Sequence, residues 1–306
     1  MRAAARIAQG FLARPARVAL LAFLVAGVIG ICVCADAAAD EHAAAARFFA
    51  TLHRFHQDTA VQADAVVDGR TLVDGVYRLE ERGTGRFLAL ITESGDVIGD
   101  GQGWRWIDAE GFRPLAEAEA GRLRGEILGA IDWRRLVEVR YGRGGGRRIL
   151  LVSAVDCPVC ARMEAGLAER AGTLDTSFRL LPMSLSPGTD SEAGAAGWDK
   201  AARIWCAADG AAWRAYWSAR TLPPRDACPI DGPQALRLAR NLATVLSSIG
   251  VPVRGTPTMI REDGSVLRLP RDADDSFYID ELGPAGLRAA AGPTAGAHRR
   301  WLDAPG

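Results

Sequence analysis

Lysine and histidine are both scarce in this sequence, although charged residues as a whole are not. Lys200 is the only lysine, and none of the four histidines lies between residues 57 and 297. A cysteine protease needs a histidine base beside its nucleophile, so this scarcity argues against that class. The 37 basic residues balance 37 acidic ones and form no basic block, which argues against nucleic-acid binding.

The N-terminal 35 residues have the three parts of an export signal. Four arginines precede an almost unbroken apolar run at 18–33, and Val33-Cys34-Ala35 then supplies small residues suited to cleavage. The arginines are Arg2, Arg6, Arg14 and Arg17. The apolar run is short for a membrane-spanning helix, so we expect a signal peptide at 1–35 and an exported protein. An uncleaved N-terminal anchor is the alternative.

Cysteine is also sparse, and two of the six cysteines lie in the predicted signal. The remaining four are Cys157, Cys160, Cys206 and Cys228. An even number of cysteines in an exported protein is typical of disulfides. The simplest pairing joins Cys157 to Cys160 and Cys206 to Cys228, and we expect the second pair to be a structural bridge.

The first cysteine pair is the CxxC motif Cys157-Pro158-Val159-Cys160, and its context predicts redox chemistry. An apolar run at 148–155 predicts a buried strand before it, and 160–170 predicts a helix with Pro158 in its first turn. A helix N-terminus favours a thiolate, so Cys157 is the predicted attacking residue and Cys160 the buried resolving thiol. The neighbouring carboxylate of Asp156 would oppose thiolate formation if it points the same way.

Two predicted segments of the chain precede the CxxC motif. Residues 40–113 predict a small α+β domain, with a helix at 41–57 and strands at 76–79, 87–91 and 104–107. Residues 114–135 predict a linker helix, because four apolar residues fall on one stripe of it. These are Leu123, Ile127, Leu128 and Ile131. At about 70 residues the first domain is near the lower limit for independent stability, which favours pairing with a second copy.

The remaining chain predicts an α/β domain at 136–292, followed by a loose tail at 293–306. The strands are expected at 136–141, 148–155, 178–183, 254–260 and 266–269. A mostly helical insertion at about 190–249 interrupts them, and its four tryptophans have spacings that indicate helix packing rather than a ligand box. A last helix is expected near 280–291.

This layout resembles the DsbC/DsbG-type periplasmic disulfide isomerases, which are thiol:disulfide interchange proteins of the thioredoxin superfamily. The resemblance covers 40–292 in element order and is strongest over 136–270. It rests on the CxxC after an apolar strand, the Thr256-Pro257 dipeptide, and the two cysteines within the insertion. It implies a thioredoxin fold with an inserted helical subdomain, and a V-shaped homodimer joined through 40–113.

The resemblance also implies roles for Thr256 and Pro257. The bond between them would be cis and lie against the CxxC, where both residues would bind an extended substrate. A trans bond at a strand start is the alternative. One departure is Pro158, because the family usually has glycine there, whereas proline is common in strongly oxidising motifs.

The leading functional hypothesis is isomerisation or reduction of wrong disulfides in exported proteins, without a cofactor. Its partners would be misoxidised exported proteins and a membrane thiol reductant that resets the site. A thiol oxidase is the alternative enzyme, and a chaperone or assembly factor of an envelope apparatus is the alternative from another class. A zinc site at the CxxC would need two more ligands at fitting spacing, and an inert disulfide there is the remaining alternative.

Overall fold

The computed structural model describes residues 46, 48–50, 53–54, 66–81, 83–100, 103–108, 111–143, 146–207, 209–270, 273 and 275–284. The predicted signal at 1–35 and the predicted tail at 293–306 lie outside the described residues. Of the helix predicted at 41–57, the described residues are helical, and Phe48 and Phe49 among them are buried.

The first half of the chain forms an antiparallel sheet in which the strands follow one another in sequence order. Its strands are β1 (Val66–Arg70), β2 (Val76–Glu81), β3 (Phe87–Thr92), β4 (Val97–Asp100), β5 (Gly103–Asp108) and β6 (Gly111–Pro114). The three predicted strands are confirmed as β2, β3 and β5. The other three were missed because each carries glycine or proline, residues that weaken a strand pattern.

Helix α2 (Glu117–Gly129) and a short 3₁₀ turn, η2 (Trp133–Arg135), lead to the second half. The predicted helix is therefore present but shorter than 114–135. Ile127 and Leu128 are buried as the apolar stripe predicts, whereas Leu123 is half-buried. The helix ends at Gly129, and Ile131 beyond it forms an isolated β-bridge with Val73, which lies between β1 and β2.

The second half contains a mixed sheet in the order β11-β10-β8-β9-β7. Its strands are β7 (Val137–Gly142), β8 (Arg147–Ala154), β9 (Asp175–Met183), β10 (Thr258–Arg261) and β11 (Val266–Leu267). Strand β8 pairs parallel with β9 and antiparallel with β10. Since β8 is buried along most of its length, its near-continuous apolar run fits a central strand.

Helices surround this second sheet. They are α3 (Pro158–Glu169), α4 (Glu192–Ala207), α5 (Gly210–Ala219), α6 (Gly232–Ser248) and α7 (Asp275–Leu282), with the 3₁₀ turn η3 (Arg225–Ala227) before α6. The chain is thus a mixed α/β protein with two sheets, and the order of elements after α2 is compatible with a thioredoxin-like fold. The insertion is helical as predicted, and Trp198 and Trp213 are fully buried in its packing.

The last helix differs from its prediction near 280–291. Helix α7 begins at Asp275, whose carboxylate lies in the positively polarised first turn, and it ends at Leu282. Gly283 and Pro284 follow, and this pair stops a helix. The predicted continuation from 285 onward lies outside the described residues.

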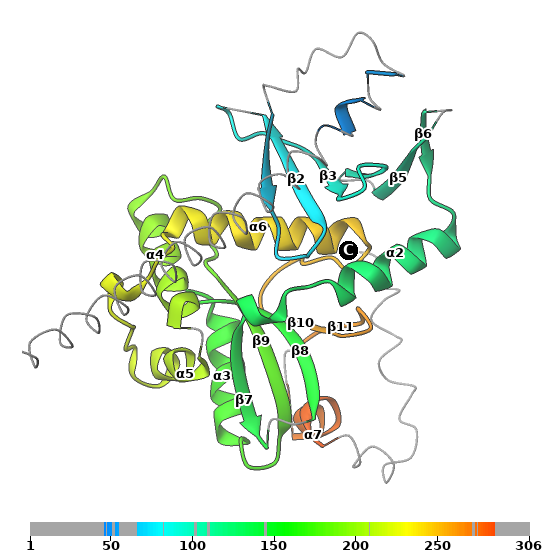
Figure 1. The fold of residues 1–306 in the computed structure, drawn as a ribbon. Helices are drawn as coiled ribbons and strands as arrows, with labels where there is room; N and C mark the ends of the chain where they lie inside the picture. Colours follow the sequence, from blue (N-terminus) through cyan, green and yellow to red (C-terminus); the bar gives the residue numbers. More distant parts are fainter. Residues whose placement is uncertain are drawn as a thin grey trace, which may run out of the picture.

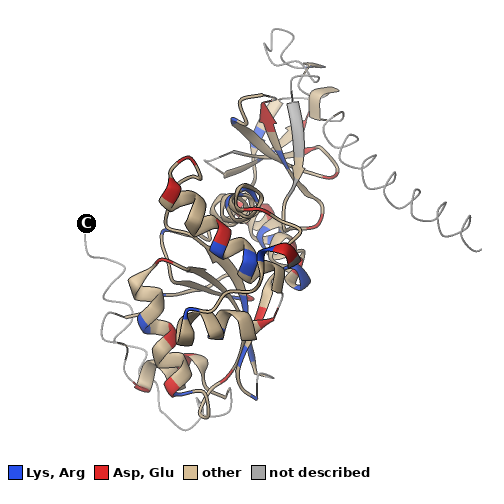
Figure 2. Ribbon diagram, turned by 90° about the vertical axis from the view of Figure 1, so that its left-hand side faces the viewer, with Lys and Arg blue, Asp and Glu red and all other residues tan. Residues whose placement is uncertain are grey.

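The two halves share a hydrophobic core. Figure 1 shows α6 lying between the two sheets, and the Trp104 indole of β5 donates a 2.9 Å hydrogen bond to the Ser248 hydroxyl at the end of that helix. Leu72, Leu90 and Trp104 from the first half belong to the same buried cluster as Leu246 of α6. Acidic and basic positions are interspersed along both halves (Figure 2).

Within the described part of the chain, no helix combines the length and apolar character that crossing a membrane requires.

Candidate functional site

The CxxC lies at the turn from β8 into α3. Cys157 is the N-cap residue of α3 and Pro158 is its first helical residue. Proline is favoured there because its fixed φ suits a helix start and its missing N–H has no helical partner to lose. The Cys157 sulfur accepts a 3.3 Å hydrogen bond from the backbone N–H of Cys160. The motif therefore places one sulfur at the cap and the other one turn into the helix.

The segment before β10 completes the site. The Thr256–Pro257 bond is cis, as the resemblance implies. The Cys157 thiol donates to the Thr256 carbonyl oxygen at 3.3 Å, although 99 residues separate them. The sheet explains this proximity. Because Thr258 of β10 pairs with Val152 of β8, the chain entering β10 lies beside the carboxyl end of β8, where α3 begins.

Both motif cysteines are buried, which differs from the exposed attacking thiolate that the chemistry suggests. Cys157 is 4% exposed and Cys160 is 0% exposed. They pack with Ala154, and Met183 and Trp217 lie against this small cluster. Val159, between the two cysteines, is 37% exposed. A client sulfur would therefore have to approach Cys157 past Val159 and Thr256.

The two thiols have opposite pKa shifts. Burial raises the pKa of Cys157, but Thr256, the Cys160 thiol and the N–H groups of Cys160 and Val159 together lower it below its usual value. Burial raises the pKa of Cys160 to about 12, against a smaller lowering by Ser153. The pair is thus electrically asymmetric, with the thiolate favoured on Cys157.

The Asp156 carboxylate is held by the far end of β9. It accepts hydrogen bonds from the Ser184 hydroxyl at 2.6 Å and the Leu185 N–H at 2.8 Å. These two bonds fix the direction of the side chain, which the sequence leaves open. The carboxylate is therefore engaged with residues 184–185.

Sequence reasoning missed Glu164, a fully buried carboxyl group on α3. It accepts a 2.7 Å hydrogen bond from the Tyr141 hydroxyl of β7. Burial raises the pKa of Glu164 to about 7, while Tyr141, Trp213 and Arg214 oppose that rise. A signal was available, because Glu164 follows Cys160 by four residues and so shares the buried face of the helix.

An open groove adjoins the motif. It has a volume of about 370 Å³ and begins at Val159 and Thr256. Its other apolar lining residues are Pro252, Pro257, Val266 and Leu269, and its polar and charged lining includes Thr258, Arg254 and Arg268. Since Thr256 contacts the Cys157 sulfur, one end of the groove lies next to the reactive thiol.

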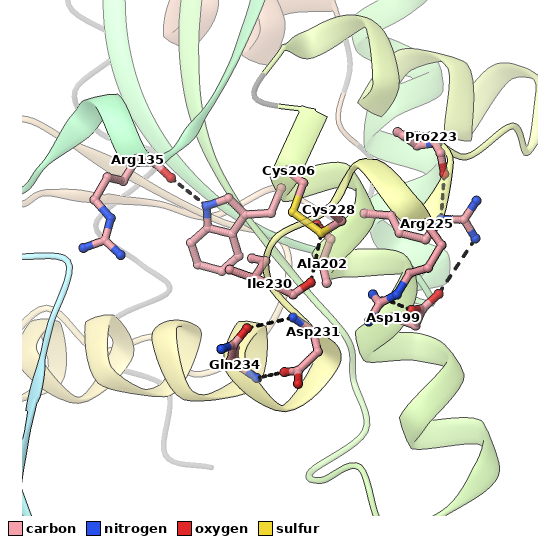
Figure 3. The surroundings of a disulfide bond; sticks show 12 residues. Arg135, Asp199, Ala202, Cys206, Pro223, Arg225, Cys228, Ile230, Asp231 and Gln234 are labelled. Carbon is pink, nitrogen blue, oxygen red and sulfur yellow. Dashed lines mark hydrogen bonds and ion pairs between the residues drawn. A yellow bond between two sulfur atoms is a disulfide. The ribbon is translucent and has the colours of Figure 1, made fainter. Parts of the chain in front are cut away.

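The other two cysteines form a disulfide within the helical insertion (Figure 3). Cys206, at the end of α4, is bonded to Cys228, which follows η3. Trp205 beside it donates to the Arg135 carbonyl, and Arg225 pairs with Asp199 at 2.7 Å. Cys157 and Cys160 are both free thiols. The four cysteines therefore divide into a bonded pair within the insertion and a thiol pair at the CxxC.

A zinc site is one alternative for the CxxC, and it would need further ligands. Among the described residues, no group of three or more His, Cys, Asp or Glu side chains is arranged to hold a metal ion. Cys206 and Cys228 are bonded to each other, so neither is a thiolate ligand in this form.

No model of a known protein family matches the chain, and no curated protein matches it. Among solved structures, it is similar to a disulfide interchange protein from Neisseria gonorrhoeae, at 20% identity over 44% of this chain and 85% of that one, with a TM-score of 0.33. It is also similar to DsbG from Helicobacter pylori, at 12% identity over 64% of this chain and 93% of that one, with a TM-score of 0.30. These TM-scores are low, so the function proposed for this chain rests on the geometry of its own site.

Proposed function

We propose that this chain is a thiol:disulfide interchange enzyme that isomerises or reduces wrong disulfides in exported proteins. One observation carries the proposal. The Cys157 sulfur, at the N-terminus of α3, contacts both the Cys160 N–H and the Thr256 carbonyl, and the pKa values of the two thiols are shifted in opposite directions. Exchange requires this asymmetry, because one thiolate attacks the client disulfide and a second thiol can later resolve the mixed disulfide.

The reaction begins when the Cys157 thiolate attacks one sulfur of a client disulfide. A new S–S bond joins Cys157 to the client, and the second client sulfur leaves as a thiolate with the electron pair of the broken bond. A lowered pKa of Cys157 raises the thiolate fraction at neutral pH. Thr256 and Pro257 line the groove beside this sulfur and are the proposed substrate-binding residues.

The mixed disulfide then has two outcomes. In isomerisation, another client thiolate attacks the client sulfur of the mixed disulfide, and Cys157 leaves as a thiolate, so no net oxidation occurs. In reduction, Cys160 loses its proton and attacks Cys157, which forms the Cys157–Cys160 disulfide and releases a reduced client. The raised pKa of Cys160 slows this second path and leaves time for the first. A membrane thiol reductant would return the oxidised pair to its dithiol form.

The test is recovery of activity by a small ribonuclease whose disulfides have been scrambled. The mature protein should speed recovery over a glutathione buffer alone, because its attacking thiol is activated. Cys157→Ala should reduce the rate to that of the buffer, whereas Cys160→Ser should keep part of it because isomerisation needs only the attacking thiol. Equal rates for the original protein and Cys157→Ala would overturn the proposal and favour the chaperone alternative.

A thiol oxidase is the second candidate, because Pro158 and the lowered pKa of Cys157 both favour an oxidising site. A stabilised thiolate stabilises the reduced pair and so makes its disulfide a stronger oxidant. Titration against glutathione separates the two candidates. A potential of about −120 mV fits an oxidase, and one of about −200 mV fits an isomerase or reductase.

The proposed biological setting is the periplasm, with export directed by residues 1–35 or anchoring by them if they are not cleaved. We further propose that 40–113 is a dimerisation domain, 114–135 its linker, and 136–292 the catalytic domain. The first sheet supports this proposal because β1 and β6 lie at its edges and can extend it by strand pairing. Light scattering of the mature protein should give twice the chain mass, and a monomer at working concentration would contradict it.

A further inference from the structure

The groove beside the CxxC carries a positive charge. Arg254 and Arg268 line it and are both exposed. The lining residues include no aspartate or glutamate. An acidic group entering the groove would therefore meet two guanidinium groups and no opposing carboxylate among its lining residues.

These two arginines differ from many others in the chain. Arg170 pairs with Asp275 at 2.6 Å, and Arg225 pairs with Asp199 at 2.7 Å. Within the described part of the chain, no ion pair or hydrogen bond joins the side chain of Arg254 or Arg268 to another residue. Both guanidinium groups therefore keep their full hydrogen-bonding capacity, and a planar guanidinium matches the two oxygens of a carboxylate.

The apolar residues of the groove indicate which side chains a ligand should carry. Val159, Val266 and Leu269 line it together with the two arginines, so the surface suits a chain that presents both apolar and acidic side chains. Because Thr256 contacts the Cys157 sulfur, such a chain would have its cysteine at the end of the groove. An extended segment advances about 3.3 Å per residue, which puts the residues next to that cysteine within the groove.

We propose that the groove binds an extended client segment with acidic residues beside the cysteine that Cys157 attacks. This inference rests on the proposed interchange function and names the substrate class for it. Charge complementarity at partly exposed pairs is modest, so both arginines together should give a preference of about threefold to tenfold. The preference should decrease as salt screens the charges.

The experiment uses the mature protein carrying Cys160→Ser, which stops at the mixed disulfide. Three short peptides share one sequence except for the two residues that flank their single cysteine, which are Asp, Asn or Lys. Each cysteine is first joined to thionitrobenzoate. The Cys157 thiolate attacks the peptide sulfur, forms the protein–peptide disulfide and releases the thionitrobenzoate anion, whose absorbance gives the rate.

We expect the Asp peptide to react about threefold to tenfold faster than the Lys peptide. Replacing both groove arginines, Arg254→Glu and Arg268→Glu, should invert the order. Arg237→Glu, an exposed arginine of α6 outside the groove lining, is the matched control and should keep the original order. Dividing the Asp/Lys rate ratio of one protein by that of another removes the intrinsic reactivity of the peptides. If the charge-reversed protein does not fold, the neutral variant with Arg254→Gln and Arg268→Gln replaces it. This variant should have a lower Asp/Lys rate ratio than the protein that keeps both arginines.

Two failures are distinguishable. If the Asp/Lys ratio is the same with and without the groove arginines while all peptides react, the inference is wrong and the interchange function stands. If no peptide reacts with any protein that retains Cys157, the proposed function itself fails.

Discussion

The Tyr141 hydroxyl donates a 2.7 Å hydrogen bond to Glu164 and so joins β7 to α3 inside the core. Both residues are 3% exposed. Burial, followed by the charge of Glu164, raises the pKa of Tyr141, which keeps the phenol protonated as a donor. The helix that carries the CxxC is therefore anchored through a buried acid one turn beyond Cys160.

This acid should make stability depend on pH. Burial raises the pKa of Glu164 from 4.5 to about 7, so between these values the folded chain holds the proton more tightly than the unfolded chain. Stability should then fall as pH rises through this window, by up to about 3 kcal/mol. In Glu164→Gln this fall should be absent, and denaturant unfolding at several pH values measures it. Glu169→Gln, an exposed carboxyl on the same helix, is the control. Parallel curves for Glu164→Gln and the original protein would contradict the prediction.

The asymmetry of the two thiols predicts selective alkylation. With the pair reduced at neutral pH, iodoacetamide should modify Cys157 before Cys160, because the pKa of Cys157 is lowered and that of Cys160 is raised to about 12. The pH at half-maximal rate should lie below that of an unperturbed thiol, because the pKa of Cys157 is lowered. Mass spectrometry of the digested protein identifies the modified residue. Cys157→Ser should leave a nearly unreactive motif, and equal labelling of both cysteines would contradict this reading.

The Cys206–Cys228 disulfide should contribute to stability rather than to turnover. It links residues 22 apart in sequence, and closing a loop of this length stabilises the folded chain by about 3 kcal/mol. Replacing both cysteines with alanine should lower the free energy of unfolding by about that amount and leave the alkylation rate of Cys157 unchanged. Denaturant melts and the alkylation assay measure the two quantities. A large loss of Cys157 reactivity in a folded double variant would show that the bridge also positions the site.

Gly142, at the end of β7, should not accept a side chain. Its φ of +65° suits glycine, and an added Cβ would lie 1.6 Å from the Leu174 carbonyl oxygen. Backbone must move to relieve that contact, so Gly142→Ala should destabilise the protein by roughly 2 kcal/mol or more. Gly172→Ala is the matched control, because an added Cβ there meets nothing within 4 Å. Thermal unfolding of both variants measures the difference, and equal melting temperatures would refute the steric argument.

The elements around the CxxC could be predicted from the sequence because their signals are local. An apolar run predicts β8, and Pro158 at a helix start predicts α3, since these preferences act between residues close in the chain. Strands β1, β4 and β6 could not be predicted in this way. Their glycines and proline weaken the local pattern, and pairing with neighbouring strands in the sheet defines them instead.

By itself, the sequence determined the thiol pair, its place between strand and helix, and the candidates Thr256 and Pro257. Only the tertiary structure decided which groups meet. It brought the Thr256 carbonyl to the Cys157 sulfur across 99 residues, turned Asp156 toward Ser184, and buried Glu164. The physical reason is that hydrogen-bond partners, burial and the pKa values that follow from them depend on long-range packing, which no short window of sequence contains.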